Sequence, residues 1–95
     1  MSRPRREVEE FANYMEDVLR DNDDKGGWQS MSILDIIDRM EEELHEVRTV
    51  YLKSKSTDWR ALKHEAADVA NFCMMLADVI DKRYLFPDTQ GKVTE

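Results

Sequence analysis

The chain contains a single cysteine, Cys73, so no disulfide can form within it. Its neighbours Ala70, Met74 and Ala77 predict that Cys73 is a buried small apolar residue. No segment approaches the roughly 20 apolar residues that a membrane-spanning helix needs. Residues 3–6 are basic but run into acidic residues instead of an apolar segment, which argues against a secretory signal. We therefore expect a soluble cytoplasmic protein.

Positive charge is also scarce. The chain has 14 Lys and Arg against 21 Asp and Glu, a formal net charge of −7. Such a surface repels the phosphate backbone of a nucleic acid, which disfavours polynucleotide binding. A free nucleotide stays possible, because metal ions can reconcile acidic side chains with a polyphosphate.

The 95 residues predict one domain spanning 1–95, with 41% hydrophobic residues arranged at helical spacing. A domain of this size buries a thin core when alone. We expect an all-α fold in which a homodimer or homotetramer completes a four-helix-bundle-like core.

Helical periodicity predicts a first helix over residues 4–21, followed by a polar loop that ends at Gly26 and Gly27 beside Trp28. A Ser-x-x-Asp start at Ser32 predicts a second helix that ends near residue 53. The apolar positions of this second helix are Ile33, Ile36, Ile37, Met40, Leu44, Val47 and Tyr51.

A third helix is predicted from about residue 58 to 83, capped by Ser56 or Thr57, and it should be the most buried element. Its apolar face comprises Trp59, Leu62, Ala66, Val69, Cys73, Leu76 and Ile80. The short connection predicts an antiparallel hairpin with the second helix. The tail over 85–95 should dock Leu85 and Phe86 and then fray.

Two pairs of acids are the informative feature: Glu43 with Glu46, and Glu65 with Asp68, each spaced i, i+3 on one side of a helix. The pairs lie at similar separations from the turn, so a rise of about 1.5 Å per residue brings them to matching depth in the hairpin. Four carboxylates should meet across one interface.

Glu43 and Glu65 also lie next to apolar positions, where an unpaired charge is costly. Oxygen ligands alone select hard cations, so Mg²⁺ is the expected ion, with Mn²⁺ plausible. The alternative is that the acids form part of a solvated face, which is our interpretation for Glu41 and Glu42.

In its motif the sequence resembles the MazG-like all-α nucleoside triphosphate pyrophosphohydrolases, whose signature is E-x-x-E, a spacer, and E-x-x-D. Here Glu43-x-x-Glu46 is followed after 18 residues by Glu65-x-x-Asp68, and the resemblance covers about residues 30–82. It implies that these four acids bind Mg²⁺ and that a nucleoside triphosphate is hydrolysed to monophosphate and pyrophosphate. Relatives include enzymes acting on dUTP or dCTP, house-cleaning enzymes for aberrant nucleotides, and phosphoribosyl-ATP pyrophosphohydrolase.

The chemistry that this resemblance implies needs an activated water. Glu46, with Glu43 beside it, is the candidate to orient or deprotonate that water. The resemblance makes Trp28 and Asn71 candidates for base binding. We expect Asn71 on the polar flank of its helix. Candidate phosphate contacts are Lys53, Lys63 and Arg83. All five are also explicable as ordinary packing or surface residues.

Two other functions remain open. A di-iron carboxylate bundle needs Glu-x-x-His on two helices, but only Glu42-x-x-His45 has that spacing, and Ala61 stands three residues before His64. We expect both histidines at the surface. A non-enzymatic helical dimerisation or nucleotide-sensing module would explain the apolar faces and leave the acids incidental.

Overall fold

The computed structural model describes residues 2–53 and 56–87, and within these ranges the chain is helical and contains no strand. The α-helices are α1 (Arg6–Arg20), α2 (Ile33–Lys53) and α3 (Trp59–Ile80). A short 3-10 helix, η1 (Asp23–Lys25), follows α1, and a π-helical turn, η2 (Asp81–Leu85), extends α3. The predicted all-α fold is confirmed. None of the described helices is both long enough and apolar enough to cross a lipid bilayer.

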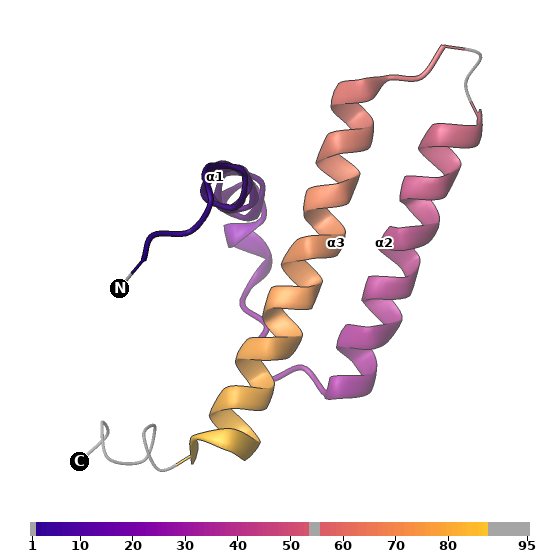
Figure 1. Ribbon diagram of the computed structural model, residues 1–95. Helices are drawn as coiled ribbons and strands as arrows, with labels where there is room; N and C mark the ends of the chain where they lie inside the picture. Colours follow the sequence, from indigo (N-terminus) through magenta and orange to yellow (C-terminus); the bar gives the residue numbers. More distant parts are fainter. Residues whose placement is uncertain (1, 54–55, 88–95) are drawn as a thin grey trace.

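The helices α2 and α3 form the predicted antiparallel hairpin, and α3 is the central element (Figure 1). In this view α1 is seen almost end-on, so it crosses α3 steeply, on the side away from α2. The connection from α1 to α2 runs past the C-terminal half of α3 before α2 begins. This connection and α1 therefore both contribute to the surroundings of α3.

The two hairpin helices begin at side-chain caps. Ser32 Oγ accepts a hydrogen bond of 3.0 Å from the Asp35 backbone N–H, as predicted for α2. The cap of α3 is Asp58, whose Oδ1 accepts from the Ala61 N–H at 3.0 Å, so the prediction of Ser56 or Thr57 is wrong. A carboxylate satisfies the free N–H group and also carries the charge favoured at a helix N-terminus.

Few side chains are fully enclosed. Within the described residues the buried ones are Val18 of α1, Ile36 of α2, and Ala67, Asn71 and Val79 of α3. The predominance of α3 in this set confirms that it is the most buried element. Four apolar side chains make a thin core, as expected for a domain of this size.

One apolar side of the hairpin is uncovered in the single chain. Leu44, Tyr51 and Trp59, all predicted on the apolar faces, are 58%, 54% and 66% exposed. Cys73 is also exposed, 3.8 Å from Met40 Sδ, so its predicted burial is wrong. The reason is that α1 packs against a different side of α3, and no described element of this chain covers Cys73.

The C-terminal segment also departs from the prediction. Leu85 and Phe86, expected to dock, are exposed together with Tyr84, because the chain leaves the bundle through η2 with no described element facing them. The remainder of the predicted tail, residues 88–95, and the centre of the hairpin turn, residues 54–55, lie outside the described residues.

Candidate functional site

The structure brings the four predicted acids close enough for their charges to influence one another. Burial raises the pKa of Glu43 in α2, and the charges of Asp68 and Glu65 in α3 raise it further. Burial likewise raises the pKa of Glu65, followed by the effects of Asp68 and, across the hairpin, Glu46. The charged forms of Glu43 and Glu65 are therefore disfavoured in the metal-free protein, and a bound cation would stabilise them.

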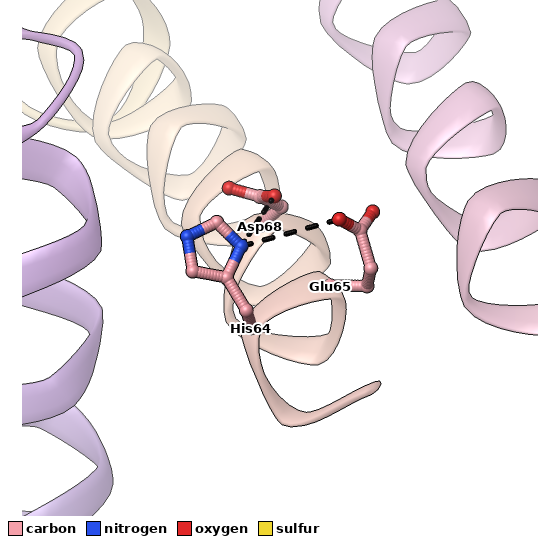
Figure 2. Close-up of side chains that lie close together, drawn as sticks. All are labelled: His64, Glu65 and Asp68. Carbon is pink, nitrogen blue, oxygen red and sulfur yellow. Dashed lines mark ion pairs between the residues drawn. The ribbon is translucent and has the colours of Figure 1, made fainter. Parts of the chain in front are cut away.

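His64, which was predicted at the surface, has a side chain that is 45% exposed and also joins this cluster. Its Nδ1 lies 3.5 Å from Asp68 Oδ2 and 4.0 Å from Glu65 Oε1, with all three side chains on one turn of α3 (Figure 2). One ligand atom from each of the three lies within 4.8 Å of the others, close enough to bind one metal ion. Burial raises the pKa of Asp68, and the imidazole opposes that shift. The i, i+4 spacing of His64 and Asp68 was the available sequence signal.

A pocket of about 400 Å³ adjoins the acids. Its lining includes Glu43, His64 and Asp68 as well as Trp28 and Asn71. Further lining residues come from the connection between α1 and α2. The pocket thus joins two of the four predicted metal ligands, Glu43 and Asp68, to both residues that were predicted to bind a base. Glu46 and Glu65 are not among its lining residues.

Asn71 is 3% exposed, so its predicted place on a polar flank is wrong. Its Nδ2 donates to the Met15 carbonyl of α1 at 3.1 Å. Within the described residues its Oδ1 has no hydrogen-bond partner. The Met15 carbonyl can only accept, which fixes the amide orientation and leaves a buried acceptor at the pocket lining.

Two cations that the sequence analysis missed lie at this pocket. Lys25 from η1 and Arg39 from α2 both line it and both lower the pKa of Asp68. The Arg39 guanidinium also stacks 5.3 Å above the centre of the Phe72 ring. Arg39 stands four residues before Glu43, which is a recognisable helical pair, whereas Lys25 is in a loop and has no periodic signal.

The three predicted phosphate contacts are not among the residues lining the pocket. Lys63 lies 4.3 Å above the Tyr14 ring centre, because α1 crosses α3 there. Arg83 donates to the backbone carbonyls of Gln29 and Met31. Lys53 is exposed at the end of α2, beside the hairpin turn.

Two other acids of α2 lie at the solvent-exposed surface of the helix. Glu41 and Glu42 are exposed, as predicted, and Glu42 is ion-paired with Arg39. His45 is exposed on the same helix, so the Glu42-x-x-His45 motif lies on a solvated side. This arrangement offers no support for a di-iron centre built on that motif.

A comparison with models of known protein families finds no match, and no solved structure matches the chain. A protein of Archaeoglobus fulgidus, described as uncharacterized, is 38% identical over 68 residues. The matched region covers 72% of this chain and 70% of the archaeal protein. The chain therefore belongs to the same protein family as this archaeal protein.

Proposed function

We propose that the chain is a MazG-like, Mg²⁺-dependent nucleoside triphosphate pyrophosphohydrolase, which cleaves a ribo- or deoxyribonucleoside triphosphate to monophosphate and pyrophosphate. The observation that carries the proposal is the electrostatic interaction between the acids of α2 and those of α3, of which Glu43 and Asp68 line a pocket of nucleotide-compatible size. Partly buried carboxylates that repel one another destabilise the fold unless a cation is bound, and a nucleoside triphosphate reaches an enzyme as a complex with Mg²⁺.

The donor set fits Mg²⁺. Glu43, Glu46, Glu65 and Asp68 would hold it, since all four offer carboxylate oxygens. Burial raises the pKa values of Glu43, Glu65 and Asp68, and acidic neighbours raise those of Glu43 and Glu65 further, so a bound cation would stabilise the charged form of each. The bound ion would neutralise phosphate oxygens and lower the pKa of a water molecule. Mn²⁺ is the plausible substitute, and the His64 nitrogen beside the acids suits it better than Mg²⁺.

The remaining roles follow from the chain's own groups. Glu46 would orient or deprotonate the attacking water, with Glu43 beside it, because Glu46 is the solvent-exposed member of the four acids and its charge acts on both Glu43 and Glu65. Lys25 and Arg39, rather than Lys53, Lys63 or Arg83, would contact the phosphates, since they line the pocket.

The base would lie against Trp28 and Asn71. An indole ring supplies a stacking surface, and the unpartnered Asn71 Oδ1 supplies a hydrogen-bond acceptor. Because Oδ1 can only accept, a base that offers an N–H or amino group is favoured. The proposed role is the house-cleaning hydrolysis of aberrant nucleotides.

We further propose that the active form is a homodimer or homotetramer. The uncovered apolar side of the hairpin, with Leu44, Tyr51 and Trp59 more than half exposed, supports this assembly. Helix pairs that expose such a side commonly form four-helix cores with a second copy.

The same uncovered side favours a second candidate function, a non-enzymatic dimerisation or nucleotide-sensing module. In that case assembly and nucleotide binding would occur without turnover. The two functions differ in whether pyrophosphate is released.

The deciding experiment measures pyrophosphate release from a panel of canonical and modified nucleoside triphosphates with Mg²⁺. We expect release by the native chain and a loss of about 100-fold or more in Glu65→Gln, because a direct metal ligand is at least as important as the outer partners whose loss costs 10–100-fold. Glu41→Gln makes the same chemical change on the exposed side of α2 and should retain the native rate. No release from a folded, Mg²⁺-binding chain would refute the enzyme and favour the sensing module.

A further inference from the structure

One wall of the pocket is a loop segment, residues 26–31, which lacks α-helical structure. Gly26, Trp28 and Met31 from this segment line the pocket. Gly26 has a φ of 90°, a backbone conformation that side chains rarely allow. The segment therefore depends on contacts with other elements to hold a single conformation.

Arg83 supplies one such contact. Its Nη2 donates to the Gln29 carbonyl at 2.6 Å and to the Met31 carbonyl at 2.7 Å. One guanidinium nitrogen thus joins two carbonyls across the turn in which the Met31 N–H donates to the Trp28 carbonyl at 3.0 Å. Bonds from a charged donor are stronger than those between neutral groups.

Asp78 supplies the second contact. Its Oδ2 accepts from Trp28 Nε1 at 3.0 Å, and Lys82 Nζ lies 3.0 Å from Oδ1 of the same carboxylate. The Trp28 bond and then Lys82 lower the pKa of Asp78, so the carboxylate stays an acceptor at neutral pH. The hydrogen bond to Asp78 holds the indole by its N–H edge and so fixes the orientation of the ring beside the pocket. The N–H is the only hydrogen-bonding group of the indole, so the ring faces need no partner.

We propose that Asp78 and Arg83 are positioning residues that hold segment 26–31, with the Trp28 ring, as a preformed wall of the pocket and so set the affinity for the base of a nucleotide. The naming of the base rests on the proposed function. Neither residue needs to touch the nucleotide. Their contribution is to order the wall before binding, which spares the ligand the entropic cost of ordering it.

The first test uses no nucleotide. In a Trp59→Phe background Trp28 is the only tryptophan, so its fluorescence reports on the wall. We expect Asp78→Ala and Arg83→Gln each to red-shift the emission and to increase quenching by acrylamide at least about 2-fold, because an undocked indole is more exposed. Asp78→Asn, which keeps a carbonyl acceptor, should restore most of the native signal. Asp81→Ala removes a neighbouring exposed carboxylate and is the control.

The reasoning is overturned if Trp28 emission and quenching stay native in both variants while far-UV circular dichroism shows an intact helical fold. A collapse of helicity in Asp78→Ala or Arg83→Gln does not end the test, since Asp78→Asn and Arg83→Lys make smaller changes. Arg83→Lys keeps the charge but loses the planar donor group, so we expect an intermediate signal.

The second test measures steady-state pyrophosphate release by the same variants. We expect KM to rise about 10-fold with kcat within about 2-fold, because the wall acts in binding. A fall in kcat at unchanged KM would overturn the assignment of the two residues to base affinity.

If the native chain releases no pyrophosphate, binding of an α,β-imido nucleoside triphosphate with Mg²⁺, followed by Trp28 fluorescence, replaces turnover. An about 10-fold weaker Kd in the two variants then supports the proposal even though hydrolysis has failed. Native-like affinity in both variants, or no binding by the native chain, overturns the assignment to base affinity. The nucleotide-free measurement still decides whether Asp78 and Arg83 hold the wall.

Discussion

Removing one charge from the acid cluster should stabilise the metal-free protein. Glu65 and Asp68 side chains are 23% and 21% exposed, and their carboxylate oxygens belong to the set of ligand atoms within 4.8 Å of one another. At 4.8 Å two such charges repel by about 0.9 kcal/mol in water and about 3.5 kcal/mol at an effective dielectric constant of 20. Both groups retain contact with solvent, and His64 offsets part of the repulsion, so we expect about 1 kcal/mol from Glu65→Gln.

Thermal unfolding followed by far-UV circular dichroism, at neutral pH and fixed protein concentration, measures this effect. For a domain of this size about 1 kcal/mol corresponds to a rise in Tm of about 4–8 °C in EDTA. Mg²⁺ at ten times its Kd should stabilise the native chain by about 1.4 kcal/mol, because it binds only the folded state. Glu65→Gln should lose most of that gain.

Glu41→Gln is the matched control, since it removes one negative charge from an exposed position of α2. Its stability should stay within about 0.5 kcal/mol of native, and its response to Mg²⁺ should be unchanged. Destabilisation of Glu65→Gln in EDTA would show that the acid is held by favourable contacts rather than crowded by like charges. A native response of this variant to Mg²⁺ would remove Glu65 from the ion's ligands.

Three other predictions concern the metal-free chain. Its stability should fall as the pH rises from the ordinary pKa values, 4.5 for Glu and 3.8 for Asp, through the raised folded pKa values of Glu43, Glu65 and Asp68, because the folded state retains these protons longer. Urea titrations at several pH values measure this slope, and Asp68→Asn should reduce it. Trp59→Asp should weaken self-association at least about 10-fold in sedimentation experiments, since it places a charge on the uncovered apolar side, and an unchanged association constant would locate the contact elsewhere. Asn71→Leu should cost about 1–3 kcal/mol in urea unfolding because the carbonyl of α1 that it serves loses its buried donor, and a neutral effect would mean that water replaces the bond.

The hairpin and its acids could be predicted from sequence because both depend on periodicity. Glu43 and Glu65 stand at fixed angles on their helices, and the antiparallel turn relates their depths. The cap at Ser32 was also predictable from its hydroxyl and the acid three residues later. Ser56, Thr57 and Asp58 are all good caps, so local chemistry alone does not choose among them.

The burial of Asn71 and the role of Lys25, which were not predicted, depend on where α1 and the connection after it lie against α3. Asn71 is buried because the Met15 carbonyl faces it, a contact over 56 residues of sequence that no local pattern encodes. Lys25 lines the pocket from η1, in a connection that is tied to α3 through Asp78 and to η2 through Arg83. The misplacement of Cys73 has the same origin, because the amphipathic pattern identifies an apolar side but not which element covers it.

The central position of α3 has a consequence for the order of folding. Its contact with α2 closes across a short turn, whereas Asn71 meets α1 over 56 residues and Asp78 meets Trp28 over 50. Local contacts form at a lower entropic cost than distant ones, so the hairpin should assemble first and α1 with its loop should dock onto it afterwards. In native-state hydrogen exchange the amides of α1 should accordingly exchange before those in the middle of α3, and the pocket would open and close with α1 while the acids of the hairpin stay together.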